Sequence, residues 1–305
     1  MPAGSLEQRL SARQFAITTE ITPPVAVLAE ALQQHASELR GLVDAVNLTD
    51  GAGARAHMDV MAAAVLLKQS GVEPIMQLTC RDRNRIALQS LLLGSAALGI
   101  CNLLILRGDD PRAGDQPDAK PVFDLDPVTL LATAVAIRDR GELPHGRPVD
   151  GRARYFLGAA DMPIDPPPDW EPAALLRKLN AGAQFIQTQF CMDAEILRRY
   201  MSCLQQHGVT DRAHFLIGVA PLASARSARW IRDKLFGSII PDAIIRRLEA
   251  ASDPKAEGQQ ICLDLMSEYQ TIPGVAGVHV MAPLNESAVP ELVSEFRRRN
   301  GTKAG

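Results

Sequence analysis

The chain has 305 residues, of which 47% are hydrophobic, and its net charge is −3 at pH 7. This length allows one large α/β domain or two smaller ones, and the weak negative charge argues against a nucleic-acid or anionic-membrane partner, which would favour a basic patch. The five cysteines form no C-x-x-C pair, no apolar run reaches the ~18–20 residues of a membrane span, and Met1–Ser11 lacks the apolar core of a signal peptide, so we expect a cytoplasmic protein.

Short apolar segments alternate with helical patterns along the whole chain. Each apolar segment has the composition of a strand that is covered on both faces. The predicted strands are Phe15–Ile21, Val43–Leu48, Pro74–Thr79, Asn102–Leu106, Tyr155–Ala159, Gln184–Gln189, Phe215–Val219 and Gly277–Met281.

Apolar residues at helical spacing predict helices between these strands. Three are clear, and Gly71 and Gly208 follow two of them, where a left-handed cap is common. The predicted buried faces are Met58, Met61, Ala62, Val65 and Leu66 in Arg55–Gln69; Ile86, Leu91, Leu92 and Leu98 in Arg83–Leu98; and Ile196, Leu197, Tyr200 and Leu204 in Ala194–Gln206.

Eight β/α units can be counted, and no linker divides the chain. Ile239–Ala250 and Glu257–Thr271 both have helical patterns before the last strand, so one of them is an insertion. We therefore predict a single α/β domain over residues 1–305, a (β/α)8 TIM barrel with an extra helix near the seventh and eighth units. The irregular segments Pro111–Pro121 and Met162–Pro172 follow strand ends and should belong to the catalytic face.

The run from Leu103 to Pro111 is the strongest local signal, because an apolar strand leads directly into Arg107-Gly108-Asp109-Asp110. In a barrel of this type the chemistry takes place at the carboxyl ends of the strands. Arg107 offers a fork for phosphate or carboxylate, Gly108 permits a close backbone approach, and Asp109 can accept from the N–H groups of a heterocycle. The alternative is a salt bridge within the loop.

Other strand ends carry polar residues as well. Glu20 is either a general acid at the barrel mouth or a solvated carboxylate before Pro23-Pro24. Gln77 should face the barrel core or its mouth, where a cofactor edge would satisfy its amide. Gln189 can donate to and accept from a pterin-like ring, with a capping amide as the alternative. Asp82 is predicted to cap the helix that begins near Arg83.

Gly51-Ala52-Gly53-Ala54-Arg55-Ala56 matches the G-x-G-x-x-A pattern of dinucleotide-binding folds, and Glu73 supplies the expected acidic residue. The pattern lies in the second unit, however, and the parallel units continue beyond the six strands of a Rossmann sheet. We favour a glycine pair beside a ligand to which Thr49 donates a hydrogen bond. Cys191 and Cys203 are interpreted as apolar packing, and the histidines show no metal-ligand spacing.

Taken together, the motifs resemble the methylenetetrahydrofolate reductase family, specifically its short single-domain bacterial branch. The similarity runs from about Phe15 to Val280. It is carried by Thr19-Glu20 with Pro23-Pro24, Asn47–Gly51, Leu78–Cys80, Leu106–Asp109, Phe123–Leu131, Lys178–Ala183 and Thr188–Phe190.

This resemblance implies a flavoprotein that interconverts 5,10-methylenetetrahydrofolate and 5-methyltetrahydrofolate, with NADH or NADPH reducing the flavin. Glu20 would be the acid that promotes protonation at N10. Asp109 would lie at the junction of flavin and pterin, and Gln189 would bind the pterin. The expected flavin-contacting residues are Thr49, Gln77, Arg107, Gly108, Asp109, Phe123, Asp126, Glu171 and Lys178.

The chain departs from the family pattern at four places. Gln77 replaces a histidine of better-known bacterial members, and the loop Ala160–Asp165 lacks the usual Tyr-Pro-Glu run. Ala225 replaces an aromatic residue, and Leu284-Asn285-Glu286 lacks an arginine. The expected cofactor is FAD, with FMN as the alternative. Two further alternatives are a pterin-binding barrel that acts only within a redox complex and a Rossmann dehydrogenase. Family members usually self-associate, so we expect a homo-oligomer.

Overall fold

Eight parallel strands close into a barrel in chain order, from β1 beside β2 round to β8 beside β1. The computed structural model describes residues 5–283 and 285–301; Leu284 and the first four residues of Met1–Ser11 lie outside them. The strands are β1 (Ala16–Ile21), β2 (Ala45–Leu48), β3 (Pro74–Thr79), β4 (Asn102–Leu106), β5 (Phe156–Asp161), β6 (Phe185–Phe190), β7 (His214–Val219) and β8 (Val275–Val280). The predicted TIM barrel is confirmed, and the Rossmann alternative is wrong because its sheet would be open.

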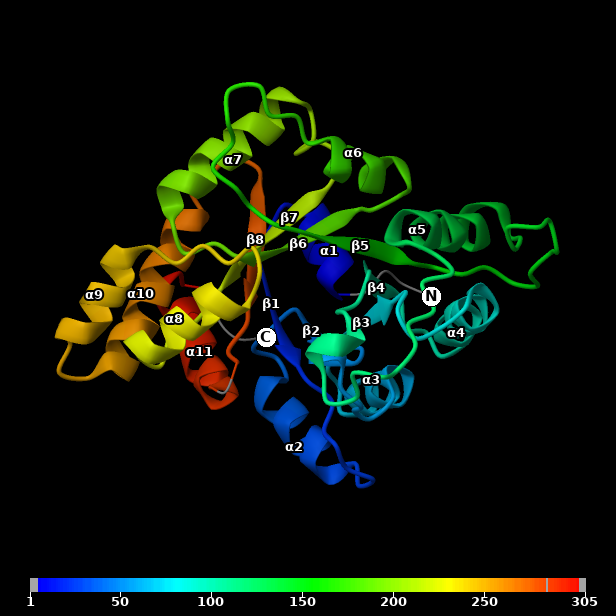
Figure 1. The fold of residues 1–305 in the computed structure, drawn as a ribbon, viewed down its shortest axis with the longest axis horizontal. Coiled ribbons are helices and arrows are strands. Elements are labelled where there is room, and N and C mark those ends of the chain that lie inside the picture. Colours follow the sequence, from blue (N-terminus) through cyan, green and yellow to red (C-terminus); the bar gives the residue numbers. More distant parts are fainter. Residues whose placement is uncertain (1–4, 284, 302–305) are drawn as a thin grey trace.

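Helices surround the barrel (Figure 1). They are α1 (Ser5–Ser11), α2 (Glu30–Leu39), α3 (Val60–Gln69), α4 (Arg85–Ala97), α5 (Pro127–Val135), α6 (Ala173–Asn180), α7 (Ala194–Gln206), α8 (Ala225–Lys234), α9 (Asp242–Ala250), α10 (Pro254–Tyr269) and α11 (Val289–Arg299). The short turns are η1 (Ala52–Ala54), η2 (Pro111–Ala113), η3 (Ala136–Arg140) and η4 (Glu286–Ala288). The crowded segment before β8 holds α8, α9 and α10, one helix more than the two patterns indicated.

The N-terminal helix α1 closes the bottom of the barrel. Its Leu6 and Leu10 are buried against an inner layer. That layer is formed by Ala16, Ala45, Ile75, Leu104, Phe156, Phe185 and Leu216. The sequence analysis noted only that Met1–Ser11 lacks the apolar core of a signal peptide, because two leucines are too few to show a periodicity.

The buried face of α3 differs from the prediction. Its buried positions are Val60, Ala63, Ala64 and Leu67, whereas the predicted stripe is half-buried and Ala62 is exposed. The helix also begins at Val60 rather than Arg55, because the Asp59 side chain accepts from the N–H groups of Met61 and Ala62. Helical spacing alone could not tell the strand-facing side from the side that faces a neighbouring helix.

In α4 the prediction is correct for Leu92 but wrong at both ends. Ile86 is 72% exposed and Leu98 is 48% exposed, while Leu88 and Ser95 are buried. The cap of this helix is Asn84, whose side chain accepts from Ala87 N–H, and not Asp82. The prediction for α7 is confirmed at Leu197, Tyr200 and Leu204, with Ile196 half-buried. Gly71 and Gly208 adopt positive φ, as predicted.

No helix among the described residues is long and apolar enough to cross a membrane.

Candidate functional site

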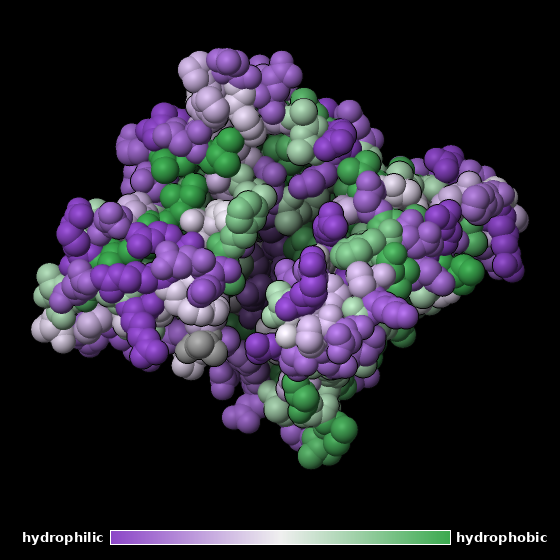
Figure 2. Space-filling view, in the orientation of Figure 1, coloured by the Kyte–Doolittle hydropathy of each residue, from purple (hydrophilic) through white to green (hydrophobic). Residues whose placement is uncertain are grey.

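The inner face of the barrel changes from apolar to polar toward the carboxyl ends of its strands. Successive side chains of a strand point to opposite faces, so positions two residues beyond the apolar inner layer point inward as well. At those positions the chain places Thr18, Asn47, Gln77, Gln187 and His279, each at most 8% exposed. The barrel therefore holds a buried polar layer directly beneath its mouth. Figure 2 shows a hollow near the centre of the face, with hydrophilic residues in its depth.

Glu20 lies at the end of β1 in this mouth, with its side chain 25% exposed. Glu20 pairs with Asn47 on the adjacent strand β2. The Oε2 atom of Glu20 lies 3.8 Å from Nε2 of His279 on β8. This partly shielded carboxyl group can reach a ligand in the mouth while its other side faces a buried imidazole.

Two polar side chains at the same end of the barrel as Glu20 make no hydrogen bond to the described residues. The Oγ1 atom of Thr49 is buried and makes no hydrogen bond to the described residues. The Gln77 side chain is 8% exposed and likewise forms no hydrogen bond to the described residues, but its amide atoms are not fully buried. Because a buried polar group without a partner is destabilising, Thr49 Oγ1 indicates a place that a polar ligand would complete, and the Gln77 amide is free to contact the same ligand.

The loop after β4 brings Arg107, Gly108 and Asp109 to the same end of the barrel as Glu20. The guanidinium of Arg107 lies over the Phe123 ring, 4.8 Å from its centroid, and it forms no ion pair within residues 5–283 and 285–301. Phe123 has a φ of 42°, a conformation that is uncommon outside glycine. A cavity of about 320 Å³ lies along Arg107, Gly108 and Phe123.

Gly108 also has a structural reason to be glycine. Its φ is 89°, and a Cβ atom there would lie 2.9 Å from Cβ of Arg81 and 3.1 Å from Cβ of Thr79. The loop does contain a salt bridge, which was the predicted alternative, but it joins Asp110 to Arg112, with Oδ2 and Nη2 2.5 Å apart. This bridge leaves Arg107 and Asp109 available for other contacts.

Two arginines fix the loops around the mouth, and the sequence analysis missed both. Arg83 forms a bidentate pair with the buried Asp50, at 2.6 and 3.1 Å, and Asp50 also accepts from the N–H and hydroxyl of Thr79. Arg81 donates to the carbonyls of Gly51 and Asp109. The carboxylate of Asp82, predicted to be a helix cap, instead receives two hydrogen bonds from Arg81.

The end of β6 carries an extra residue where it pairs with β7. Gln187 pairs with Leu216, but Phe190 rather than Gln189 pairs with Gly218, so Gln189 lies in a β-bulge. A Cβ atom on Gly218 would lie 2.6 Å from the Thr188 carbonyl, so only glycine allows this irregularity.

In this bulge the Gln189 side chain contacts only nearby backbone. Its Oε1 accepts from Phe190 N–H at 3.0 Å and its Nε2 donates to the Phe236 carbonyl at 3.3 Å. This is the capping role that was left open, and the binding of a pterin by Gln189 remains a prediction.

Lys178 on α6 reaches the end of β5. Its Nζ donates to the Ala160 carbonyl at 2.6 Å and lies 3.9 Å from Asp161 Oδ1. The other oxygen of Asp161 accepts from the Tyr200 hydroxyl. Burial raises the pKa of Asp161, against the opposing effects of the Tyr200 hydrogen bond and the Lys178 charge.

Two further predicted flavin contacts lie at the starts of helices α5 and α6. Asp126 is the N-cap of α5, where its carboxylate accepts from Thr129 N–H at 2.7 Å, and hydrogen bonding from the Thr129 hydroxyl and then from its N–H lowers the pKa of Asp126. Glu171 is exposed in the segment that precedes α6, without a described side-chain contact to the other site residues. The structure brings the residues at the ends of β1 to β4, β6 and β8 to one end of the barrel, and the flavin contacts of Asp126 and Glu171 remain predictions.

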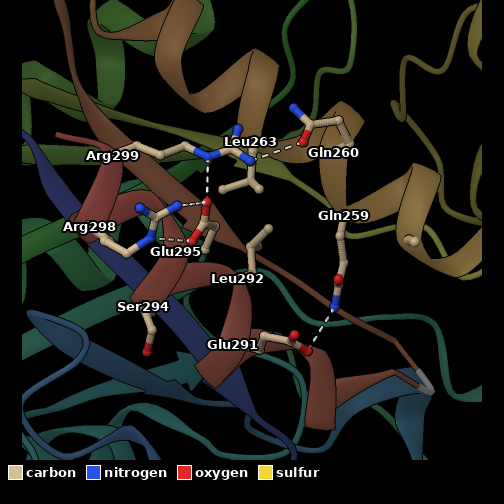
Figure 3. A pocket seen from close by; sticks show the side chains of 10 residues that line it. Gln259, Gln260, Leu263, Glu291, Leu292, Ser294, Glu295, Arg298 and Arg299 are labelled. Carbon is tan, nitrogen blue, oxygen red and sulfur yellow. Dashed lines mark hydrogen bonds and ion pairs between the residues drawn. The ribbon is translucent and has the colours of Figure 1, made fainter.

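A second hollow of about 400 Å³ lies on the outside of the barrel, between α10 and α11 (Figure 3). Its polar groups pair with one another: Glu295 with Arg298 and Arg299, Gln260 with Arg299, and Gln259 with Glu291. Within the described residues no group of three or more His, Cys, Asp or Glu side chains could hold a metal ion. The mouth is thus the better candidate site.

The fold and the mouth define the class of protein: a TIM barrel with an acid, unpartnered polar groups and a glycine-bearing arginine–aspartate loop at one end. The chain belongs to the methylenetetrahydrofolate reductase family, whose pattern it matches over residues 5–297. It is 23% identical over 243 residues to a probable methylenetetrahydrofolate reductase (NADPH) of Caenorhabditis elegans, covering 77% of this chain and 34% of that protein. It is 24% identical over 202 residues to methylenetetrahydrofolate reductase 2 of Schizosaccharomyces pombe, covering 66% of this chain and 31% of the relative.

The chain thus spans about a third of the length of these curated relatives. Two solved structures share its fold. One is an uncharacterized protein from Clostridium thermocellum that binds two copies of 5-methyl-5,6,7,8-tetrahydrofolic acid, with a TM-score of 0.66, 15% identity and coverage of 96% and 99% of the two chains. The other is an EDTA monooxygenase from Chelativorans sp. BNC1, with a TM-score of 0.59, 10% identity and 95% coverage of each chain.

Proposed function

We propose that this chain is a flavin-dependent oxidoreductase that interconverts 5,10-methylenetetrahydrofolate and 5-methyltetrahydrofolate, with NADH or NADPH as electron donor. The observation that carries the proposal is the convergence of Glu20, Thr49, Gln77 and Asp109 at one barrel mouth, with Thr49 Oγ1 buried and unpartnered. Family membership supports the same chemistry.

The residues present fit a flavin. Thr49 and Gln77 offer a hydroxyl and an amide to the polar edge of a ring, and Arg107 over Phe123 offers an unpaired cation beside a cavity. A bound flavin would accept hydride from the nicotinamide and release it to the folate. We expect FAD, with FMN as the alternative, and hold the contacts of Asp126, Glu171 and Lys178 as part of the proposal.

The side chains of the protein would bind the folate, orient it and protonate it. Glu20 is placed to hold a proton at the mouth and to deliver it toward N10 of the folate, which opens the five-membered ring. Asp109 is fixed by its hydrogen bond from Gly53 N–H, so its free carboxylate oxygen can accept from a heterocycle. Gln189 would exchange its contact with the Phe236 carbonyl for the pterin edge.

The test is the visible spectrum of the purified protein and the mass of any released flavin. We expect absorbance near 450 nm that is bleached by NADH or NADPH without oxygen and restored by 5,10-methylenetetrahydrofolate. A protein that gains no such absorbance with added FAD or FMN would contradict the proposal.

A second candidate is a pterin-binding subunit that turns over folate only within a larger redox complex. It is favoured by the loop after β5, where Asp161 is engaged by Tyr200 and Lys178 in place of the usual Tyr-Pro-Glu run. Turnover by the isolated chain with a nicotinamide would exclude this candidate, and turnover only with a partner would support it.

We also propose that the chain self-associates. The residues Val25, Val27 and Leu28 after β1 are 81%, 98% and 66% exposed, and an apolar segment of this kind is commonly covered in an assembly. Sedimentation of the purified protein at several concentrations measures this directly.

A further inference from the structure

His279 is connected to both the acid of the mouth and the interior of the barrel. It stands opposite Thr18 in the pairing of β1 with β8, and its side chain is only 4% exposed. The Nδ1 atom lies 3.0 Å from Thr18 Oγ1, and the Nε2 atom lies 3.8 Å from Glu20 Oε2. The two nitrogens thus face different partners on the same strand.

Two buried amides lead through Thr18 to this imidazole. Asn47 and Gln187 bind each other reciprocally, Asn47 Nδ2 to Gln187 Oε1 at 2.6 Å and Gln187 Nε2 to Asn47 Oδ1 at 3.1 Å. The remaining proton of Gln187 Nε2 goes to Thr18 Oγ1 at 3.2 Å. Thr18 therefore accepts from an amide, and its own hydroxyl proton remains to be donated.

The Thr18 hydroxyl proton has two acceptors in reach. The Val278 carbonyl lies at 3.4 Å, and His279 Nδ1 lies closer, at 3.0 Å. Donation to Nδ1 requires that nitrogen to be unprotonated, so a neutral imidazole carries its proton on Nε2. The Nε2–H group then points to the side on which Glu20 lies.

We propose that His279 is the positioning residue of Glu20: the Asn47–Gln187–Thr18 chain holds the imidazole with its proton on Nε2, and Nε2–H orients the Glu20 carboxylate toward the folate. The gap of 3.8 Å is longer than a hydrogen bond. A small rotation of the Glu20 side chain, which is 25% exposed and accepts no hydrogen bond from the described residues, closes it. This inference rests on the proposed function, because it assigns a role in the folate half of that reaction.

The geometry explains what His279 contributes. Once Glu20 has given up its proton, the carboxylate needs a donor to hold it for the next transfer, and Nε2–H is such a donor. The same contact is not needed when the nicotinamide reduces the flavin. His279 should therefore affect one half-reaction and not the other.

Two substitutions of His279 distinguish the role of Nε2, which faces Glu20, from that of Nδ1, which faces Thr18. In His279→Gln the side-chain amide lies as many bonds from Cβ as Nε2 does, so a donor toward Glu20 is retained. In His279→Asn the side chain can still face Thr18 but no longer reaches Glu20. We expect His279→Asn to slow reoxidation of the reduced protein by 5,10-methylenetetrahydrofolate about 10- to 100-fold and His279→Gln to recover most of that loss. Flavin reduction by the nicotinamide should be unchanged in both.

The matched control is His214→Gln, which alters a half-buried histidine at the opposite end of a barrel strand. It should leave both half-reactions at the wild-type rate. If His279→Asn does not fold, Thr18→Val removes the hydroxyl that orients the ring, and Thr18→Ser restores it. Loss in Thr18→Val with recovery in Thr18→Ser supports the inference.

A second measurement does not depend on activity. Nitrogen NMR of ring-labelled histidine in the folded protein should find His279 protonated at Nε2 and not at Nδ1, with a signal that moves in Glu20→Gln. Protonation at Nδ1, or equal folate rates in His279→Asn and wild type, would overturn the inference while leaving the proposed function intact. A wild-type protein that binds flavin but never transfers hydride to folate would instead count against the proposed function.

Discussion

The N–H group of Gly53 donates to Asp109 Oδ2 across 3.0 Å, which ties the loop after β2 to the loop after β4. Gly51 and Gly53 both adopt positive φ, and this turn is what brings the Gly53 N–H to the carboxylate. Arg81 spans the same two loops, because it donates to the carbonyls of Gly51 and Asp109. The glycine pair that resembles a dinucleotide fingerprint is thus a means of fixing Asp109.

This relationship predicts different outcomes for two substitutions of Asp109. Asp109→Asn keeps an oxygen that can accept from Gly53 N–H, so the loops stay joined and flavin affinity should be unchanged, while folate turnover falls because the charge is lost. Asp109→Ala releases the loop and should weaken both flavin and folate binding. Titration of the flavin-free protein with FAD and FMN, beside folate turnover, measures the two effects. Equal flavin affinity in both variants would contradict this role of the loop contact.

Glu20→Gln should stop folate turnover but leave flavin reduction by the nicotinamide largely intact. The amide cannot deliver a proton, and general acid catalysis of this kind contributes about 10²- to 10⁴-fold. Stopped-flow measurement of the two half-reactions separates them. A variant that still turns over folate at the wild-type rate would show that another group is the acid.

The fold was predictable because every strand of this barrel is a short, mostly apolar or alternating segment of four to six residues between helical patterns. A chain in which strands and helices alternate over eight units can adopt few folds, and a closed parallel barrel is the common one. Less predictable were the faces of α3 and α4, because alanine and serine pack against strands as well as large residues do. The packing of α1 under the barrel could not be seen either, since it depends on Leu6 and Leu10 alone.

The candidate site was predictable only where a motif carries it. Glu20 lies at the end of a strand and Arg107 and Asp109 follow one directly, and this position made them visible. His279 and Gln187 lie within strands and were missed. Two polar residues spaced two positions apart in a strand point to the same face, so they indicate an inner face that is polar. Gln187 with Gln189 and Thr18 with Glu20 have this spacing. The bulge at Gln189 needed the structure, because it results from the pairing of β6 with β7.

Thr49→Val should weaken flavin binding without destabilising the flavin-free protein. Valine has nearly the same shape, and Thr49 Oγ1 has no partner among the described residues, so its removal costs no existing hydrogen bond. We expect flavin affinity to fall by about 0.5–1.5 kcal/mol, the usual contribution of one hydrogen bond. Unfolding in urea and titration with flavin measure the two quantities.

Thr133→Val is the matched control for Thr49→Val. Thr133 is equally buried, but its hydroxyl donates to the Thr129 carbonyl at 2.9 Å on α5. This control should leave flavin affinity unchanged. A Thr49→Val protein that binds flavin as tightly as wild type would remove Thr49 from the site.

The stability of the protein should depend on pH through Asp161 in an unusual direction. Burial raises the pKa of this carboxyl in the folded protein, so the folded state binds the proton more tightly than the unfolded state does. Stability from this group is therefore present at low pH and is lost as the pH rises through its folded pKa, the reverse of a carboxylate in a salt bridge. Asp161→Asn cannot ionise, so its stability relative to wild type should increase between about pH 4 and pH 7.

Asp165 in the same loop provides the control of opposite sign. It is fully exposed and pairs with Arg199, and that hydrogen bond lowers its pKa. Asp165→Asn should therefore lose a small amount of stability relative to wild type as the pH rises over the same range, because exposed pairs contribute little. Urea unfolding of the three proteins at several pH values measures the differences directly. If Asp161→Asn and Asp165→Asn change with pH in the same direction, Asp161 ionises in the folded protein as readily as an exposed carboxyl does.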